Sequence, residues 1–146
     1  GNVAIHSALA NLAVDNYAAF QENYDKGKKI LQSFPYLEAE AIILLSSVVN
    51  QVAAGFSKSD NYKNYLNQII PDLQRVTSRN EMEHRFSMMF AGLLINNASM
   101  DQSYLDRADN ILKNLIGTSP GRKLYINIVL FSKQVRNALE AQANQK

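Results

Sequence analysis

Apolar residues recur every three or four positions along most of this chain, with polar residues between them. This spacing places the apolar residues on one face of an α-helix, and no useful stretch alternates with the period of two that marks a half-buried strand. The pattern therefore predicts an all-α protein of six or seven helices, joined by short turns as antiparallel neighbours. The predicted helical segments are 3–34, 36–56, 62–77, 80–96, 104–115 and 121–143.

The first segment, residues 3–34, holds either one long helix or two abutting helices. We predict a break near Asp15 and Asn16, because both residues favour helix caps over helix interiors. Gly27 lies on the apolar stripe of this segment, where it costs about 1 kcal/mol relative to Ala. A close crossing with another helix would explain a glycine at this position.

Three prolines divide the helical pattern. Pro35 predicts that one helix ends at Phe34 and the next begins, because the residue before a proline is disfavoured in the α region. Pro71 falls inside a helical pattern, where it removes a hydrogen bond and clashes with the preceding turn, so we expect a kink or a short break. Pro120 follows Ser119, and this pair predicts a capped start for the last helix, with proline in its first turn.

The chain is organised around residues 78–130. Ser78 and Glu81 have the spacing of a capping box, in which each side chain accepts a hydrogen bond from a free backbone N–H at the start of a helix. From Phe86 to Ile95 the helix that follows is apolar on nearly every side, so it is predicted to be central and buried. Gly92 on this helix is expected to mark a close helix–helix approach.

Residues 36–56 are also strongly apolar, and they contain the run AIILLSSVVNQVAAGF. This run is too short and too often interrupted by Ser, Asn and Gln for a membrane span, which needs roughly 20 mainly apolar residues. We interpret it as a second central helix, with Gly55 in its C-terminal cap region.

The last predicted helix carries two apolar faces in its first half. One face is formed by Leu124, Ile128, Phe131, Val135 and Leu139, and a second face is added by Tyr125 and Val129. The final residues, 140–146, are polar and are expected to fray.

Length and charge narrow the function classes. A chain of 146 residues is expected to form a single domain, 1–146, with a sizeable core. A net charge of +2 with scattered Lys and Arg does not favour nucleic-acid binding. The absence of cysteine excludes disulfides and thiolate metal sites. Gly1 is interpreted as a cleavage scar, which would make this a domain excised from a longer chain.

One constellation has the spacing of a metal site. Glu81 and His84 lie three residues apart, as in the carboxylate-bridged di-iron bundles, but those sites need a second such pair and two further carboxylates. His6 is the only other histidine and has no Glu partner. We therefore interpret Glu81 as a capping residue and His84 as a surface histidine, and predict no metal ligand.

The remaining charged clusters have structural interpretations. Asp101, Asp106 and Asp109 crowd one predicted helix start, where the helix dipole favours negative charge. The lysines around Gly27 are predicted to form a solvated surface; they are Lys26, Lys28 and Lys29. The chain has neither a nucleophile-elbow sequence nor a glycine-rich phosphate loop. We predict no catalytic residue and no cofactor.

Residues 78–120 resemble a tetratricopeptide (TPR) repeat, a helix–turn–helix unit that ends near a proline. Counting back from Pro120, Ala108 falls at the small residue of the second helix, and Leu112 at the large apolar position four later. Gly92 falls at the close-approach site of the first helix when four extra residues are allowed in the turn 96–102. The resemblance implies structural roles for these residues and for Pro35, in a TPR-like array of helix pairs.

Three short motifs, in order, resemble the soluble C-terminal region of bacterial O-antigen polymerase/ligase-type membrane proteins. The first is an aromatic–Pro step followed by Tyr-x-x-Glu-like residues, in SFPYLEAE at 33–40. The second is the polar start and apolar run of residues 80–94. The third is the Ser-Pro step that ends residues 116–120, followed by the basic residues Arg122 and Lys123 and the aromatic Tyr125.

This resemblance implies a non-catalytic interaction or scaffolding domain in the bacterial cell envelope, attached to the inner membrane, with the membrane side left open. The polymerase or ligase chemistry would reside in the membrane portion of the parent. Two alternatives remain: a stand-alone helical-repeat adaptor or lipoprotein-type assembly factor, and a ligand-sensing helical bundle.

The expected partner is a protein: a peptide segment, the parent membrane domain or a second copy of the chain. Nucleic acid and a membrane span within this segment are not expected. A groove between the predicted helices 36–56 and 80–96 is expected to take an apolar or amphipathic segment, because both helices are so apolar.

Overall fold

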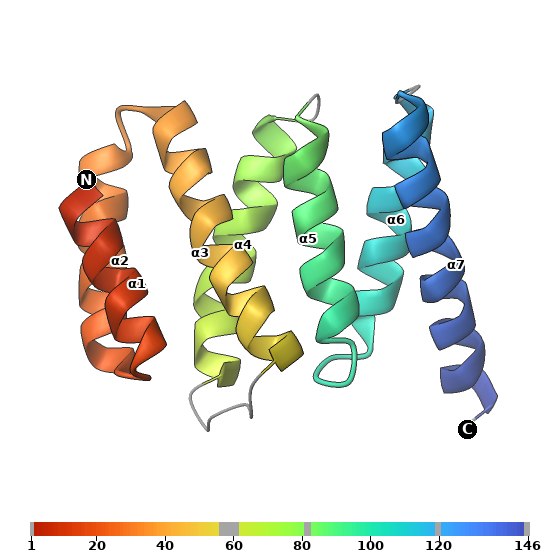
Figure 1. The fold of residues 1–146 in the computed structure, drawn as a ribbon, viewed down its shortest axis with the longest axis horizontal. Coiled ribbons are helices and arrows are strands. Elements are labelled where there is room, and N and C mark those ends of the chain that lie inside the picture. The colour runs from red at the N-terminus through yellow and green to blue at the C-terminus, as the bar shows by residue number, and fades with distance from the viewer. Residues whose placement is uncertain (1, 56–61, 81–82, 119–120, 145–146) are drawn as a thin grey trace. The chain divides into compact units, whose positions relative to one another are not determined.

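The computed structural model describes residues 2–55, 62–80, 83–118 and 121–144. The described ranges form seven helices and contain no strand (Figure 1). The all-α prediction is confirmed, and most helices pack against their neighbours in sequence. The helices are α1 (Asn2–Ala13), α2 (Tyr17–Leu31), α3 (Pro35–Gly55), α4 (Tyr62–Arg79), α5 (His84–Asn96), α6 (Ser103–Gly117) and α7 (Arg122–Asn144).

Contacts within the chain group it into two compact units, Gly1–Val76 and Thr77–Lys146. We call them unit 1 and unit 2. Unit 1 holds α1, α2, α3 and most of α4, and unit 2 holds α5, α6 and α7. The prediction that residues 1–146 form a single domain stays a prediction.

Residues 3–34 form two helices, as the predicted break near Asp15 and Asn16 requires. Asp15 has a backbone φ of 58°, in the left-handed region that Asp tolerates better than most residues. Asn16 is the N-cap of α2, and its side-chain oxygen accepts a hydrogen bond from the Ala19 N–H at 3.2 Å. The side chain of Asp15 also accepts a hydrogen bond from the Tyr65 hydroxyl at 3.0 Å, which ties this turn to α4.

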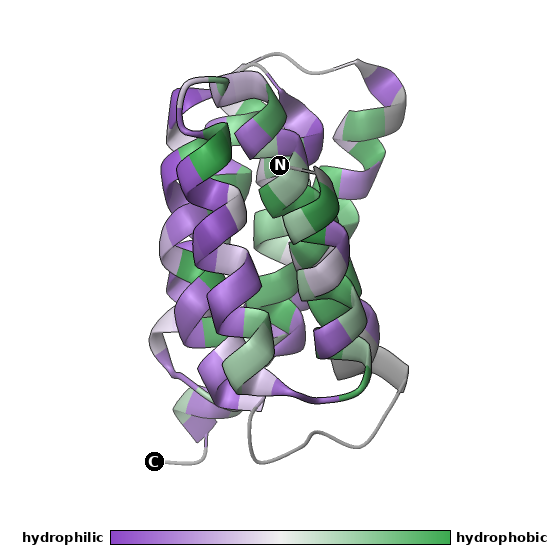
Figure 2. Ribbon diagram, turned by 90° about the vertical axis from the view of Figure 1, so that its left-hand side faces the viewer, coloured by the Kyte–Doolittle hydropathy of each residue, from purple (hydrophilic) through white to green (hydrophobic). Residues whose placement is uncertain are grey.

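The predicted close crossing at Gly27 is confirmed by the packing of α1 against α2. Gly27 is buried on α2. A Cβ added there would lie 2.8 Å from the Cδ1 of Ile5 and 3.6 Å from the Cβ of Ala4. Figure 2 shows the same pair of helices from outside, with α1 mainly hydrophobic and α2 carrying hydrophilic residues on its outer face. The glycine lets the two helices approach closely on their buried side.

Replacing Gly27 with Leu is expected to lower the free energy of unfolding by about 1–3 kcal/mol, because the larger side chain overpacks the contact with Ile5. Urea denaturation followed by circular dichroism measures this change. Gly117→Leu is the matched control, since nothing lies within 4 Å of a Cβ at Gly117. Equal destabilisation by both substitutions would show that the close approach at Gly27 is not the cause.

The predictions for Pro35 and Pro71 have opposite outcomes. α3 begins at Pro35, as predicted. At Pro71, a kink or a short break was predicted; the break is wrong, because α4 continues through this residue from Tyr62 to Arg79, and the kink stays a prediction. Pro71 is exposed, whereas Ile70 before it and Leu73 after it are buried. Burial of this apolar stripe on both sides of the proline offsets the lost hydrogen bond and the clash of the ring with the preceding turn, which together cost about 3 kcal/mol.

Aromatic side chains from α2 and α4 form the centre of unit 1. The ring of Phe20 is fully buried, with its centroid 5.4 Å from that of Tyr24 in a stacked pair. The centroid of Tyr65 lies 5.0 Å from that of Phe20, edge to face. The ring of Tyr17 lies 5.2 Å from Tyr65, also edge to face. These are the aromatic pair geometries that stabilise a core beyond the area that they bury.

In unit 2, α6 packs against both α5 and α7, and α5 also contacts α7. The predicted central position of α5 agrees with its burial, since Phe86, Ala91, Leu93 and Leu94 have almost no exposed surface. Gly92 is half-buried, and its predicted close approach stays a prediction.

The helix caps predicted for unit 2 are not found where the described residues test them. Ser78 lies in the last turn of α4 and does not cap α5, so this part of the capping-box prediction is wrong. α5 starts at His84 instead, and its N-cap Glu83 makes no side-chain capping hydrogen bond. The partner Glu81 lies outside the described residues, as do Ser119 and Pro120, whose predicted cap precedes α7. The helix α7 extends to Asn144, and the predicted fraying of its end stays a prediction.

Within the described ranges, no helix combines the length and the apolar character that crossing a membrane requires. α3 comes nearest in sequence, with 21 residues and a mainly apolar composition. Its polar residues are accommodated locally: the buried Ser46 hydroxyl donates a hydrogen bond to the Ile42 carbonyl at 2.7 Å.

Candidate functional site

The predicted chemistry-bearing residues lie apart from one another. His84 begins α5, and its Nε2 lies 3.1 Å from the Thr118 hydroxyl, which follows α6. Its sequence partner Glu81 lies outside the described residues. His6 is exposed on α1. In the part of the chain that the structure describes, no three His, Asp or Glu side chains come together as a metal site. The expectation of no metal, cofactor or catalytic residue stays a prediction.

The acidic residues near the start of α6 make local contacts. An oxygen of Asp101 accepts hydrogen bonds from the backbone N–H and the hydroxyl of Ser103, at 2.8 and 2.7 Å. Asp109 forms an ion pair with Lys113 one turn later, at 2.9 Å. Asp106 lies in the first turn, where the helix dipole favours its charge. These contacts favour the structural interpretation of the cluster over a cation site.

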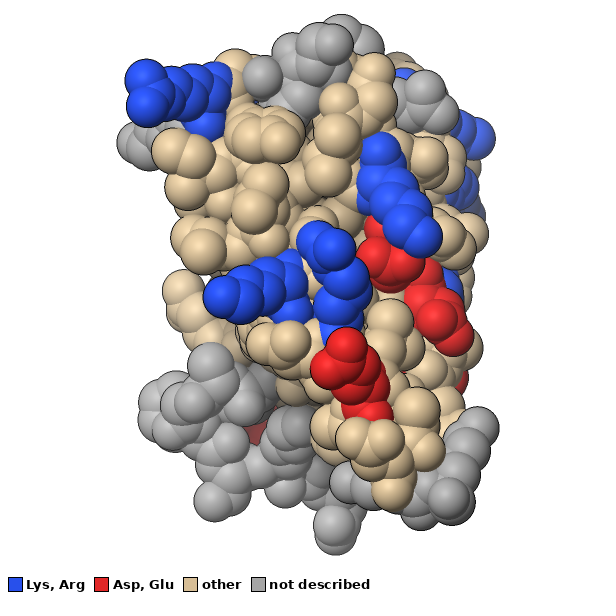
Figure 3. Space-filling model, turned by 90° about the vertical axis from the view of Figure 1, so that its right-hand side faces the viewer, with Lys and Arg blue, Asp and Glu red and all other residues tan. Residues whose placement is uncertain are grey.

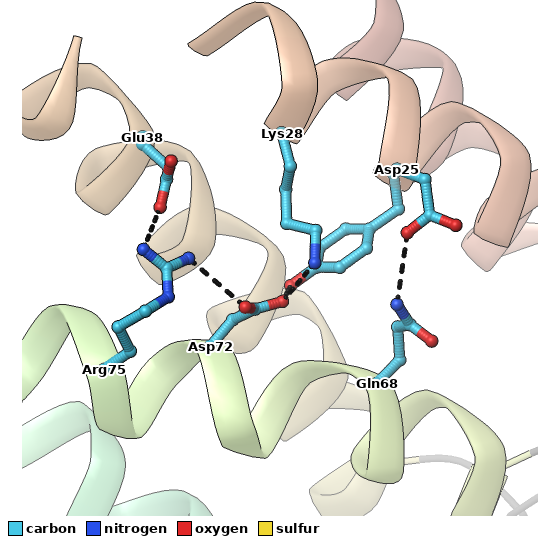
Figure 4. A network of polar contacts seen from close by, with 7 residues as sticks. Asp25, Lys28, Glu38, Gln68, Asp72 and Arg75 are labelled. Atoms are coloured by element: carbon cyan, nitrogen blue, oxygen red, sulfur yellow. Dashed lines mark hydrogen bonds and ion pairs between the residues drawn. The ribbon is translucent and has the colours of Figure 1, made fainter. Parts of the chain in front are cut away.

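A polar network in unit 1 is centred on Asp72 of α4 (Figure 4). The side chain of Asp72 is only 13% exposed. Its Oδ2 accepts hydrogen bonds from the Tyr24 hydroxyl at 2.6 Å and from the Lys28 Nζ at 2.8 Å. Its Oδ1 accepts one from Arg75 at 3.2 Å. One carboxylate therefore receives three donors, two of them charged.

The network continues from Arg75 to Glu38, a buried carboxylate in the first turn of α3. Arg75 thus bridges two carboxylates from different helices. Nearby, the Gln68 side-chain amide donates to Asp25 at 3.3 Å, which adds a second link between α4 and α2. The network joins α2, α3 and α4 through charged side chains, and Figure 4 shows these side chains converging between the three helices.

Three groups of the network, Asp72, Tyr24 and Arg75, have pKa values shifted away from neutral pH. Burial raises the pKa of Asp72, but hydrogen bonds from Lys28 and Tyr24 outweigh burial and hold it below its usual value. Burial, followed by the charge of Asp72, raises the pKa of Tyr24, so its phenol stays protonated and donates. Burial lowers the pKa of Arg75, but hydrogen bonds with Glu38 and Asp72 outweigh this effect and raise it.

This arrangement suits a structural link better than a reaction centre. A carboxylate that accepts from three donors of its own chain has little capacity left to bind a substrate or take up a proton. A phenol with a raised pKa is a poor acid at neutral pH. We conclude that the network holds the helices of unit 1 together.

The network corrects one prediction. Lys28 was expected on a solvated surface with Lys26 and Lys29, and this is wrong for Lys28. Its side chain is 26% exposed, pairs with Asp72 and lies 4.8 Å from the centre of the Tyr24 ring. Lys26 and Lys29 are exposed, as predicted. The available signal was the i, i+4 spacing of Tyr24 and Lys28, which places them on one helix face.

The helix α7 has one buried and one exposed apolar face. Ile128 and Val135 are fully buried against the rest of unit 2. The predicted second face remains uncovered. We call its four residues the outer stripe: Tyr125, Ile126, Val129 and Leu130, which are 47%, 50%, 40% and 58% exposed.

Basic side chains lie at both ends of the outer stripe. Arg122 precedes it by one turn, and Lys133 and Arg136 follow it, all exposed. At about 100° per residue, Arg122, Val129 and Lys133 fall within about 40° of one another around the helix. The charges therefore continue the stripe along the helix axis instead of flanking it. Figure 3 shows this side of unit 2, with blue side chains above and below an uncharged area and red side chains next to the lower blue ones. The exposed Glu140 follows Arg136 by one turn, beyond the basic residues.

An open hollow of about 470 Å³ lies at the start of α7. Gly121, Arg122, Leu124 and Asn127 line it, and its walls are mainly apolar. The hollow includes Arg122, the basic residue that precedes the outer stripe. Among the described residues, the outer stripe and this hollow give unit 2 a surface with both apolar area and charge.

Comparisons with protein-family models, curated proteins and solved structures found no match for this chain. Its family is therefore not identified by similarity. The described residues form an all-helical fold of seven helices, and the exposed surfaces of these helices carry the evidence for function.

Proposed function

We propose that this chain is a non-catalytic protein-interaction or scaffolding domain. The observation that carries the proposal is the outer stripe of α7, where four large apolar side chains lie exposed while the opposite face of the same helix is buried. Exposed apolar patches of this kind, bordered by polar residues, are typical of protein-interaction sites. The charged network of unit 1 supports the non-catalytic part of the proposal. Its carboxylates accept hydrogen bonds from side chains of the same chain, which leaves them little capacity to bind a substrate.

The finer proposal is a TPR-like array of helix pairs. Its support is the packing of sequential helices as neighbouring pairs and the full burial of Ala108 and Leu112 on α6, at the positions where a TPR unit carries its small and large apolar residues. Arrays of this kind use extended surfaces to bind peptides and helices. The groove predicted from the sequence stays a prediction. Within unit 1, α3 leaves Leu37 and Leu44 about half exposed.

We further propose that the domain is the extramembrane part of an envelope-polysaccharide polymerase or ligase of the O-antigen type. The support is sequence motifs alone, above all the Phe34–Pro35–Tyr36 step and the Ser119–Pro120 step followed by Arg122. The glycan chemistry would then belong to the membrane portion of the parent. About a dozen membrane spans upstream in the parent reading frame would support this assignment. A lipoprotein signal would instead favour a stand-alone assembly factor.

Site-specific photocrosslinking in the full-length parent tests the interaction function. A photoreactive amino acid would replace one exposed apolar residue at a time, at Leu37, Leu44 or Leu130. The exposed polar residues Gln21 and Asn114 are the matched control positions. We expect a discrete protein adduct from at least one apolar position and none from the controls. The absence of any adduct would contradict an interaction function.

A further inference from the structure

We propose that the outer stripe of α7 binds an amphipathic helix with apolar residues at its centre and acidic residues at both ends. This inference rests on the proposed interaction function and specifies its partner. The surface that carries it combines the four exposed apolar side chains with the basic residues Arg122, Lys133 and Arg136.

The geometry of the surface favours a helical partner. From Arg122 to Lys133 the surface extends about 17 Å along α7, which corresponds to about three turns of a second helix. A helix has no free backbone edge with which an extended peptide could pair, so the partner must satisfy its own backbone hydrogen bonds while it covers the apolar stripe. Within unit 2, α7 packs against α6 on its other face, and a partner helix would repeat this mode of packing.

The charges argue against a second copy of the chain as the partner. A two-fold symmetric pair of α7 helices would place the Arg122 end of one stripe beside the Lys133 and Arg136 end of the other. Like charges would then meet at both ends of the contact, and such juxtapositions oppose association. A partner with Glu or Asp at its ends would instead form ion pairs at both ends. Charge complementarity therefore favours an acidic helix over self-association.

The charges also argue against an anionic membrane surface. Helices that lie in a bilayer interface carry their basic residues on the face opposite the apolar one, so that the charges stay at the water side. Here Arg122 and Lys133 are in line with Val129 around the helix axis. A flat bilayer that took up the outer stripe would have to take up these charges at a similar depth. A helix with discrete acidic ends avoids this cost.

The hollow beside Arg122 adds a contact point for the partner. Its mainly apolar walls, with Leu124 among them, can take one bulky apolar side chain next to an acidic end that pairs with Arg122. A buried apolar anchor next to a charged contact is the usual composition of an interaction hot spot.

Fluorescence anisotropy with designed peptides tests the proposal on the 146-residue protein. The first probe is a labelled, helix-stabilised peptide of about 15 residues, with Leu along one central face and two Glu at each end. The second probe has Lys in place of every Glu. We expect the Glu-ended peptide to bind at least about tenfold more tightly than the Lys-ended one, and to lose affinity as salt screens the ion pairs. Equal binding of the two peptides, or binding of neither, overturns the proposal.

Two variants locate the binding site. Ile126→Ser with Leu130→Ser should weaken the Glu-ended peptide at least about tenfold. The matched control, Val3→Ser with Val14→Ser, changes two exposed apolar residues of unit 1 and should leave binding unchanged. Lys133→Glu with Arg136→Glu should remove most of the preference for the Glu-ended peptide, because only the Arg122 end of the surface still favours Glu. Circular dichroism would verify that all variants keep the helical content of the parent, and unchanged binding in the stripe variant overturns the proposal.

Three further measurements separate the other outcomes. Co-sedimentation with phosphatidylserine vesicles, without peptide binding, would assign the surface to membranes. Dimerisation that the stripe variant abolishes would assign it to a second copy. In the full-length parent, an adduct at Leu37 or Leu44 with none at Leu130 would leave the interaction function standing and remove the role of α7. If no position gives an adduct, both the interaction function and the role of α7 are contradicted.

Discussion

Replacing Phe20 with Ala is expected to lower the free energy of unfolding by about 3–5 kcal/mol. The ring of Phe20 has no exposed surface and packs against the rings of Tyr24 and Tyr65 at 5.4 and 5.0 Å. Truncation removes apolar area from the core and leaves a cavity that these neighbours fill only in part, because their hydroxyls are held by hydrogen bonds to Asp72 and Asp15. The loss is a large fraction of the stability of a domain of this size.

Urea denaturation followed by far-ultraviolet circular dichroism measures the effect of Phe20→Ala. Phe34→Ala is the matched control, because Phe34 is more than half exposed, and it should change stability by less than about 0.5 kcal/mol. If residues 1–146 form one domain, all helical signal will disappear in one transition that shifts with Phe20→Ala. A second transition that does not shift would show that unit 2 unfolds independently. A loss below about 1 kcal/mol would show that the aromatic cluster does not stabilise the fold.

The features that the sequence predicted well depend on local rules. Asn16 favours a cap wherever it stands, so the start of α2 could be placed without knowing its neighbours. Pro35 determines a helix start through its own ring and the residue before it. Gly27 on an apolar stripe indicates a close contact, although only the structure identifies Ile5 as the residue it meets.

The two mistaken local predictions show where tertiary packing prevails. Pro71 has the sequence signature of a break, yet the buried residues on either side of it keep α4 continuous. Ser78 has the signature of an N-cap, but α4 extends to Arg79 and includes it. In both cases the helical stripe through Leu73 and Val76 outweighs a preference that amounts to about 1–3 kcal/mol.

The polar network and the outer stripe could be predicted from the sequence to different degrees. Tyr24 and Asp72 are 48 residues apart, and no local pattern indicates that they meet. The second apolar face of α7 was visible in the positions of Tyr125 and Val129. Whether such a face is covered depends on which helices surround α7, and a periodic pattern on one helix carries no information about its neighbours.

Replacing Asp72 with Ala is expected to lower the free energy of unfolding by about 2–3 kcal/mol. Removal of the carboxylate leaves the Tyr24 hydroxyl and the charges of Lys28 and Arg75 without their shared acceptor. The loss of one partner from a buried ion pair costs about 3–5 kcal/mol, and we expect less here because Lys28 and Arg75 are 26% and 34% exposed. Urea denaturation at pH 7 measures the change.

Asp72→Asn is the control that separates charge from shape. The amide keeps an oxygen that can accept from Tyr24 but loses the negative charge that pairs with Lys28 and Arg75. We expect its cost at pH 7 to be smaller than that of Asp72→Ala, and greater than zero. If both substitutions change stability by less than about 0.5 kcal/mol, the network does not hold the helices of unit 1 together.

The pH dependence of stability should identify Asp72 as the titrating group. Its pKa is lowered in the folded state, because the hydrogen bonds from Lys28 and Tyr24 outweigh burial. A lowered pKa stabilises the fold fully at pH values above the unfolded value of about 3.9, and this contribution is lost as the pH falls through the folded pKa. The stability of the unmodified protein should therefore fall more steeply below about pH 4 than that of Asp72→Asn. Urea midpoints between about pH 2 and pH 7 measure both slopes, and parallel curves would show that the Asp72 carboxylate contributes nothing to the acid sensitivity of the fold.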